Sequence, residues 1–511
     1  MNKKDGQRLY DVISVGIIVL VAVFSFIRFK YLPQFIDGYY HLSCANAFIA
    51  SGGWTGIDWW DFAPYGRPNL YPPFYHFLLS LMVSLGIGGL NSLRIAEVSI
   101  VPLFFFCLWY IFRKNISRSF SFLFLVVLSS FFSFYSSVSG NIPASFAIIF
   151  GVLSWHYLKK KKVISSALFL ILAFYTHAGI PWVFVVSLVI MAIFYKEYRR
   201  ASLGVVLISI ISALPFIIHE ARYIKYVNLT MLREVKFSHY SILILAAGAA
   251  AVIYLIKRKS FFTILFLGYT VGSGIIFIKY PYRFFSAQGM LGVSLLAAYL
   301  LYEAQKHIDS NKGWIVFSSV IACFFFIHPT VDLNNGKLET HILNSTYYNI
   351  ASGKFIKMLE FNSLFYPQYY LPLAKVIRNN SDKFDIITSN IKATAQIFSA
   401  VTGRPTAYSV LGEVRGFKKV PRYSAAKIIV WMRPDYRELA YWIRKRGLVE
   451  IYENDIALIL LNPYYRSKAN PIKAKVTFKA AILWTAFFLF IFIIDNAKIL
   501  TRLNGVFKPG L

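Results

Sequence analysis

The chain has 511 residues, of which 57% are hydrophobic, 18% aromatic and only 15% charged. A mean hydropathy of +0.55 excludes an ordinary soluble protein and indicates a polytopic membrane protein. The net charge of +31 could suggest nucleic acid, but the lysines and arginines lie in short clusters between apolar runs, as in the cytoplasmic loops of membrane proteins. We therefore expect membrane lipids, and no nucleic acid, as partners.

Apolar runs along the chain predict an all-α polytopic membrane protein. A helix needs roughly 20 apolar residues to cross a bilayer, and by that measure the sequence predicts about 11–13 transmembrane helices. We expect them near residues 11–28, 73–90, 93–112, 119–136, 142–158, 163–176, 181–195, 202–218, 240–256, 261–278, 284–302, 313–328 and 474–494.

The basic clusters predict the orientation of these helices. If the clusters from 113–118 onward are cytoplasmic, the first loop at 30–72 and the region 330–472 are external. One conflict remains, because two apolar runs precede Arg113 where an odd number of crossings is needed. Either 73–90 does not cross fully, or one basic cluster is misplaced.

Residues 330–472 differ from the rest, because strand-length apolar runs alternate there with polar helical stretches. The runs are at 385–388, 427–431 and 456–461, and the amphipathic segments are at 371–380 and 435–446. We expect a transmembrane domain at 1–329, a small external α/β domain at 330–472, and a last transmembrane helix with a cytoplasmic tail at 473–511. The protein is thus predicted to be a multi-pass protein of the cell membrane.

The first loop gathers acid in an acid-poor chain, which has 23 Asp and Glu against 54 Lys and Arg. Residues 36–76 hold Asp37, Asp58, Asp61 and His41 next to the first apolar run. A carboxylate with aromatic and histidine neighbours beside a membrane anchor could act as a base or metal ligand toward a lipid-borne substrate. We interpret the loop as one wall of an active site at the membrane surface, with a helix lying on the interface after Asp37.

This loop reads DGYYHLSCANAFIASGGWTGIDWWDFAPYGRPNLYPPFYH. It resembles the first external loop of the oligosaccharyltransferase catalytic subunit and its archaeal and bacterial relatives, which belong to the GT-C superfamily of membrane glycosyltransferases. SVSGNIPASFAII at 137–149 and YPYRFFSAQGMLGVSLLAAYLL at 280–301 are similar to later segments of that family. The resemblance implies a GT-C-like fold with a C-terminal external α/β domain.

The resemblance also implies roles for two residues. Asp37 matches the first-loop carboxylate, which is catalytic or a metal ligand, and Arg283 matches an arginine beside the phosphate of a polyprenyl-linked sugar donor such as a dolichyl phosphate sugar. An arginine can hold a phosphate through two parallel hydrogen bonds. Arg283 could instead be an interfacial anchor. A protein, glycan or lipid would be the acceptor.

The sequence departs from the family at its second motif, which is acidic there but is an Asn-Ile-Pro sequence starting at Asn141 here. A divalent cation such as Mg or Mn prefers several carboxylate oxygens, so Asp37 with Asn141 alone would be a poor site. Glu220 or Glu234 could supply another oxygen. A metal-independent transferase therefore stays as open as a metal-dependent one.

Two further features are weaker indications of a functional site. Trp59-Trp60-Asp61-Phe62 looks like the acceptor signature WWDYG, but it lies in the first loop instead of the C-terminal domain, so we interpret it as coincidental. His177 lies in a Gly/Pro break between two short apolar runs, and it either satisfies free backbone groups there or takes part in catalysis.

Together these patterns predict a membrane glycosyltransferase that moves a sugar from a polyprenyl-phosphate- or pyrophosphate-linked donor to an external acceptor. Asp37 would be the general base and Arg283 the phosphate ligand, with His41, Asp58, Asp61 and other polar residues in support. The alternatives are an oligosaccharyltransferase acting on Asn, a transporter of lipid-linked sugars, and a non-catalytic subunit with a GT-C core.

Overall fold

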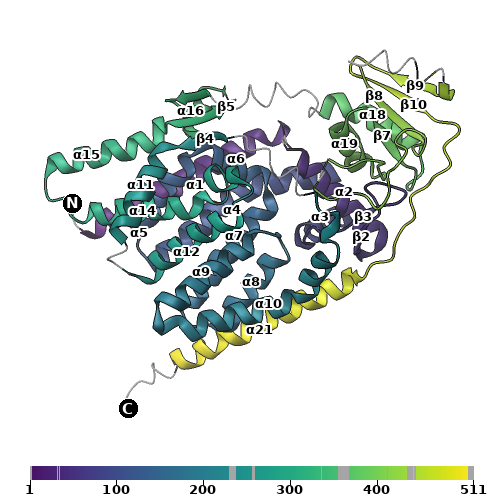
Figure 1. Ribbon diagram of the computed structural model, residues 1–511. Helices are drawn as coiled ribbons and strands as arrows, with labels where there is room; N and C mark the ends of the chain where they lie inside the picture. Colours follow the sequence, from purple (N-terminus) through teal and green to yellow (C-terminus); the bar gives the residue numbers. More distant parts are fainter. Residues whose placement is uncertain are drawn as a thin grey trace.

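Figure 1 shows a long bundle of helices with a smaller unit of strands and helices at one end. This arrangement confirms the fold class expected from the sequence. The protein is seen in a computed structural model that describes residues 3–31, 33, 35–228, 237–255, 259–334, 337–354, 367–410, 413–433, 441, 443 and 445–504.

The apolar runs fold into the helices of the bundle. Its long or apolar members are α1 (Lys3–Ile27), α3 (Phe74–Ser84), α4 (Gly89–Asn115), α5 (Arg118–Ser130), α6 (Phe132–Gly140), α7 (Ile142–Lys159), α8 (Val163–Phe174), α9 (Ile180–Phe194), α10 (Arg199–Arg222), α11 (Ile242–Leu255), α12 (Phe261–Ile276), α14 (Met290–Gln305), α15 (Asn311–Ala322) and α21 (Phe478–Asn504). Short helices join them at η1 (Arg28–Tyr31), η2 (Lys196–Tyr198), η3 (Ile224–Tyr226), α13 (Pro281–Phe285), η5 (Cys323–Ile327) and α16 (Thr346–Ala351).

Six helical segments in the described part of the chain are long and apolar enough to cross a membrane by length and composition. They are Gln7–Tyr31, Gly89–Asn115, Ile142–Lys159, Lys196–Arg222, Pro281–Gln305 and Phe478–Asn496. The protein is therefore a multi-pass membrane protein.

In contrast, α3 has 11 residues and is about 16 Å long at 1.5 Å per residue, against a hydrocarbon core of about 30 Å. Its length favours the interpretation in which 73–90 does not cross fully, one of the two ways in which the parity conflict could be resolved.

One expected span is two helices. The run at 119–136 divides into α5 and α6 because Phe131 between them has an extended backbone, with φ −78° and ψ 102°. Phe131 forms an isolated antiparallel bridge with Ser345, and its ring stacks on His328 at 5.3 Å between centroids. A contact with a distant part of the chain thus interrupts the single helix that the continuous apolar run predicts.

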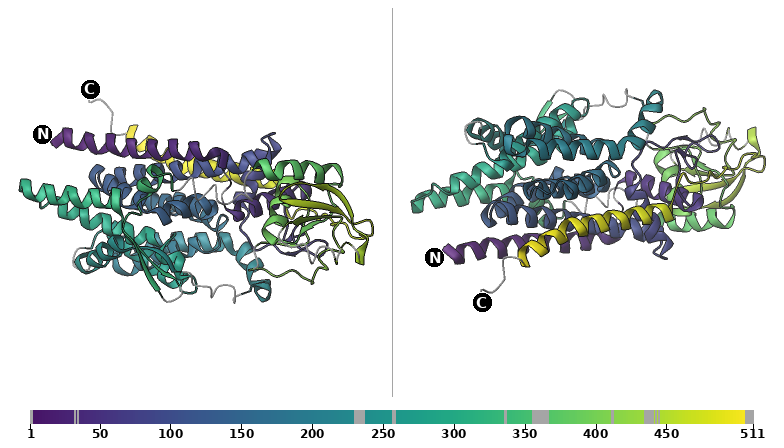
Figure 2. Two further views of the ribbon diagram at one scale, coloured as in Figure 1. Left: turned by 90° about the horizontal axis from the view of Figure 1, so that it is seen from above. Right: turned by 90° about the horizontal axis from the view of Figure 1, so that it is seen from below.

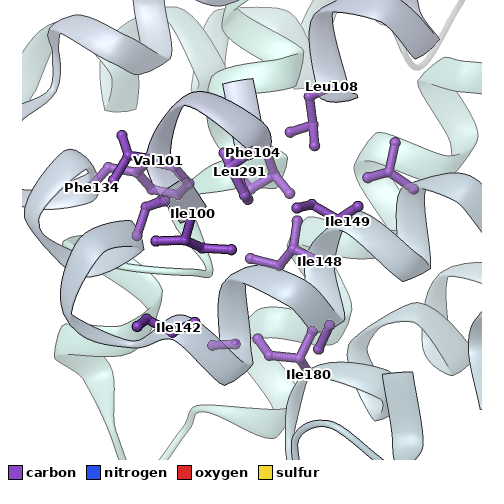
Figure 3. Packing of buried hydrophobic residues seen from close by; sticks show 14 of the residues in the cluster. Ile100, Val101, Phe104, Leu108, Phe134, Ile142, Ile148, Ile149, Ile180 and Leu291 are labelled. Atoms are coloured by element: carbon purple, nitrogen blue, oxygen red, sulfur yellow. The ribbon is translucent and has the colours of Figure 1, made fainter. Parts of the chain in front are cut away.

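The core of the bundle is mainly apolar, and Figure 3 shows side chains from α4, α6, α7, α9 and α14 meeting in it. The labelled residues are Ile100, Val101, Phe104, Leu108, Phe134, Ile142, Ile148, Ile149, Ile180 and Leu291. This packing holds the ends of α7, α9 and α14 in fixed positions, and these ends border the site described below.

The basic clusters meet at one end of the bundle. Arg113 pairs with Asp11 through both oxygens, at 2.6 and 2.7 Å, and Lys162 donates to Asn496. Both described chain ends lie at the end of the bundle opposite the strands (Figure 2). These contacts agree with the expectation that the clusters share one side of the membrane.

The second unit, residues 367–461, is called the C-terminal unit below. Its sheet has the order β7-β8-β10-β9, with β7 (Ile387–Ser389) parallel to β8 (Ile428–Met432) and antiparallel pairs elsewhere. The other strands are β9 (Val449–Glu453) and β10 (Ala457–Leu461), and the helices are α18 (Pro367–Asn379) and α19 (Lys392–Thr402). Three strands and one helix thus form where the sequence predicts them, whereas the amphipathic segment 435–446 lies mostly outside the described residues.

Small sheets tie the first loop to distant parts of the chain. Strand β1 (Gly53–Trp54) pairs with β11 (Val476–Thr477), which directly precedes α21, and β2 (Ile57–Asp58) pairs with β3 (Arg67–Pro68). Gly53 has φ 148°, and a Cβ there would lie 2.1 Å from the Val476 carbonyl oxygen. Only glycine permits this approach. A third sheet joins β4 (Phe237–Ser241), β5 (Thr330–Asn334) and β6 (Lys337–His341).

Candidate functional site

Asp37 lies in the first turn of α2 (Ile36–Ser51), which ends at Gly52 with φ 78°. The helix forms where the sequence predicts it, but it does not lie exposed on an interface. It packs between α3 and α19 of the C-terminal unit, and Ser43 Oγ lies 2.8 Å from Ser399 Oγ. At Gly38 a Cβ would approach Glu97 Oε1 to 3.3 Å, so glycine lets the helix start close to α4.

The environment of Asp37 favours its protonated form. Burial raises the pKa of its carboxyl, the negative charge of Glu413 raises it further, and the positive charge of Arg283 opposes both. The carboxyl is therefore close enough to both groups for their charges to act on it. A raised pKa brings a carboxylate nearer to the value suited to a general base.

Arg283 lies in α13, the short helix between α12 and α14 in the chain. Its Nε donates to the Tyr282 hydroxyl at 3.0 Å, and its guanidinium lies 5.5 Å from the Tyr280 ring centroid and 5.7 Å from that of Tyr282. Among the residues that the structure describes, no carboxylate forms an ion pair with it. The tyrosines hold the guanidinium in place while its charge stays available to an anionic ligand.

Tyr71 connects the charged groups to a cluster of histidines. Burial raises the pKa of Tyr71, Arg283 opposes that shift, and Asp37 and Glu413 add to it, so the charges of all three groups act on the phenol. Its ring centroid is 4.8 Å from that of His41 and 6.4 Å from that of His177. Sequence reasoning did not single out Tyr71, although it precedes the Pro-Pro pair at the end of the first loop.

The histidines behave as packed, neutral groups. His41 Nδ1 lies 2.9 Å from His76 Nε2, and burial lowers the pKa of His41 well below its usual value. His177 Nδ1 accepts hydrogen bonds from the backbone amides of Gly179 and Ile180, at 3.0 and 3.2 Å, at the start of α9. Burial lowers the pKa of His177 to about 3, with Arg283 adding to the shift. His177 thus satisfies free backbone groups, and His41 supports the ring of Tyr71.

Glu413 comes from the C-terminal unit, far along the chain from Asp37. The segment around it is held by the end of α10, because the Asn228 amide donates to the Glu413 carbonyl at 2.6 Å and the Arg415 amide donates to the Tyr226 carbonyl at 2.9 Å. The sequence analysis missed Glu413. The available signal was an acid in the motif LGEVRG, inside a region poor in acid.

Asp58 and Asp61 do not join this group but bind Arg67 in a separate buried cluster. Arg67 Nε lies 3.1 Å from Asp58 Oδ2, and Arg67 Nη2 lies 2.9 Å from Asp61 Oδ2. All three side chains are at most 3% exposed. Burial beside Asp58 raises the pKa of Asp61 to about 7, so one guanidinium balances about one negative charge. The supporting role expected for these acids is therefore structural.

The Trp-Trp pair of this loop has an equally structural role. Trp59 Nε1 donates to Ser51 Oγ at 2.8 Å, and Trp60 Nε1 donates to Ser399 Oγ at 3.2 Å. Both indoles are buried where the loop meets α19, and the Thr406 amide donates to the Trp60 carbonyl at 2.9 Å. The WWDF sequence therefore anchors the first loop to the C-terminal unit.

The remaining candidates do not assemble a metal site. Asn141 Oδ1 accepts from the Ala144 amide at 3.4 Å and caps α7, and Glu220 lies in the last turn of α10. Glu234 lies outside the described residues. Within the described part of the chain no three His, Cys, Asp or Glu side chains are grouped as ligands. The donor set expected for Mg or Mn is thus not presented by these residues.

No protein-family model matches the sequence, and no curated protein matches it significantly. Solved structures do share its fold. ArnT from Cupriavidus metallidurans bound to undecaprenyl phosphate has a TM-score of 0.55 at 13% identity, over 88% of this chain and 98% of that one. The oligosaccharyltransferase AglB from Archaeoglobus fulgidus, in complex with an inhibitory peptide and a dolichol-phosphate, has a TM-score of 0.53 at 11% identity, over 82% of this chain and 69% of that one. The archaeal protein has also been crystallised with Zn and sulfate, which does not bear on this chain. Both proteins are GT-C membrane glycosyltransferases, and the similarity shows the fold.

Proposed function

Because the chain has the GT-C fold, we propose that it is a membrane glycosyltransferase that moves a sugar from a polyprenyl-phosphate- or pyrophosphate-linked donor to an acceptor. The observation that carries the proposal is the pair of opposite charges at Asp37 and Arg283, which act on one another without forming an ion pair. Such a pair suits a substrate that has a phosphate to bind and a proton to lose.

Arg283 binds the donor phosphate in this proposal. Its guanidinium can donate two parallel hydrogen bonds to phosphate oxygens. The undecaprenyl phosphate and dolichol-phosphate of the two GT-C structures are ligands of the same chemical class.

Asp37 acts as the general base. The acceptor hydroxyl or amide loses its proton to the Asp37 carboxylate while its oxygen or nitrogen forms a bond to the anomeric carbon of the sugar. The bond from that carbon to the phosphate oxygen breaks, and its electron pair leaves with the phosphate, where Arg283 stabilises the charge. Tyr71, on which the charges of all three groups act, can donate a hydrogen bond to an anionic oxygen.

We place this site on the external face of the cell membrane. Both described chain ends lie at the far end of the bundle from the C-terminal unit (Figure 2), and the basic clusters gather with them. If that end is cytoplasmic by the positive-inside rule, Asp37 and the C-terminal unit are external.

The experiment is donor consumption by the full chain in proteoliposomes, with radiolabelled glycosyl polyprenyl phosphates as donors and a membrane extract as the source of acceptor. Asp37→Asn should lower the rate by about 10²–10⁴-fold, the usual contribution of a general base. The matched control is Asp455→Asn, which removes an exposed carboxyl from the C-terminal unit and should leave the rate unchanged. Consumption at the wild-type rate by Asp37→Asn would overturn the proposal.

A further inference from the structure

A concave site lies on the C-terminal unit near the first loop. It is a cavity of about 770 Å³ between the first loop and the C-terminal unit. Its lining includes the cations Arg415, Lys418, Lys419, Arg422 and Arg446, and none of the described residues that line it is acidic. This concentration of one sign of charge in a concave space creates a positive potential, which attracts anions.

Aromatic side chains hold several of these cations in position. The guanidinium of Arg422 lies 4.8 Å from the Tyr408 ring centroid and 5.1 Å from that of Tyr423. The ammonium of Lys418 lies 5.4 Å from the Tyr65 ring centroid. Cations above aromatic rings beside a cavity combine charge with flat apolar surface, and a charged sugar presents the complementary pair of features.

The cavity is joined to the candidate active site through the chain itself. Val414 lines the cavity, and the residue before it is Glu413, whose charge acts on Asp37. On the other side Phe62 lines the cavity, and the Arg67 guanidinium lies 5.6 Å from the Phe62 ring centroid. The segment at Glu413 and Val414 thus contributes to both sites.

We propose that this basic cavity binds an anionic saccharide, with carboxylate or phosphate groups, as the acceptor of the transfer. The assignment of this saccharide as the acceptor rests on the proposed function, whereas its binding does not depend on catalysis. A neutral saccharide lacks the negative charges that would complement the cations lining this cavity. In the proposed function the donor phosphate is bound by Arg283, which does not line the cavity.

The test is equilibrium binding to the full chain in nanodiscs of phosphatidylcholine. The probes are a fluorescent oligogalacturonate of eight sugars and, as the neutral match, maltooctaose with the same dye. The variant Lys418→Gln with Lys419→Gln removes two exposed cations from the cavity. The control variant, Lys375→Gln with Arg466→Gln, removes two exposed cations of the same region that do not line it.

Oligogalacturonate should bind the wild type and the control variant equally, and the cavity variant roughly tenfold or more weakly, as expected when charge-assisted contacts are lost. Maltooctaose should bind none of them measurably. Equal binding of both saccharides, or equal affinity in both double variants, would overturn the inference. So would loss of oligogalacturonate binding in nanodiscs of phosphatidylglycerol, since the cavity would then serve lipid headgroups.

These results separate the two proposals. If Asp37→Asn consumes donor at the wild-type rate but the cavity variant loses oligogalacturonate binding, the assigned reaction fails and the anionic site stands. If Asp37→Asn loses turnover and both double variants bind alike, the reaction stands and the acceptor class is wrong.

Discussion

Two arginines near the first loop lie close to aspartates and tyrosines, and they differ in one respect. Arg67 contacts Asp58 and Asp61 directly and is 2% exposed. Arg283 influences Asp37 but forms no ion pair with it, and its guanidinium lies beside two tyrosine rings instead. The first cluster is complete without a ligand. In the second, no described carboxylate forms an ion pair with Arg283, and we propose that a ligand binds there.

This difference shows why acid content alone does not locate an active site. Buried ion pairs restrict the conformation of a loop, and removing one partner leaves a charge without compensation. The cluster at Arg67 fixes the first loop against the C-terminal unit. We propose that the chemistry takes place instead at Asp37, which lies at the start of the same loop.

The largest expected effect comes from breaking the closed cluster. Arg67→Gln leaves Asp58 and Asp61 buried without a cation, and it should destabilise the protein by about 3–5 kcal/mol. The thermal midpoint of the full chain in detergent measures this change. Adding Asp58→Asn and Asp61→Asn should restore part of the lost stability, whereas Arg283→Gln should leave the midpoint unchanged. Equal midpoints for Arg67→Gln and the wild type would contradict the structural role of the cluster.

A smaller effect is expected at the position where the family motif would place an acid. Asn141→Ala removes the helix cap at α7 and should cost about 1 kcal/mol of stability. Because the side chain caps a helix instead of binding substrate, the turnover of surviving folded protein should not change. Donor consumption per folded molecule, measured beside the thermal midpoint, checks both statements. A loss of turnover at an unchanged midpoint would give Asn141 a chemical role.

The subtlest effect is a shift in pH dependence. Glu413 raises the pKa of Asp37, so Glu413→Gln should lower that pKa and leave more of the base ionised in acid. The acid limb of the kcat/KM profile for donor consumption should therefore move to lower pH, with little change at the plateau. Neutralising Arg283 should move the same limb to higher pH, because its charge acts in the opposite direction. If the acid limb of the Glu413→Gln profile does not move, the charge of Glu413 does not act on Asp37.

Much of the fold could be predicted from the sequence, because long apolar runs determine helices in a membrane and short apolar runs of strand length predict β7, β8 and β10. The break at Phe131 could not, because it depends on a bridge to Ser345. The sequence also pointed to Asp37 and Arg283 as a pair. The resemblance set Asp37 apart from Asp58, but only the folded loop shows that Arg67 pairs with Asp58 and Asp61.

Glu413 illustrates a second limit. It reaches the site because the chain around Asn228 pairs with the chain around Val414, and no local pattern encodes such a pairing. The cavity beside it likewise combines residues from the first loop and from several segments of the C-terminal unit. Sites assembled between distant segments become visible only when the packing is known.

The most direct test of the contrast between the two arginines is equilibrium binding of a polyprenyl phosphate without sugar to the full chain in nanodiscs. Arg283→Gln should weaken binding by about 10- to 100-fold, as expected for lost hydrogen bonds between charged groups. Asp37→Asn should bind at least as tightly as the wild type, because it removes a negative charge near the anionic ligand. If Arg283→Gln binds the polyprenyl phosphate as tightly as the wild type does, this would contradict the claim that the guanidinium binds the donor phosphate.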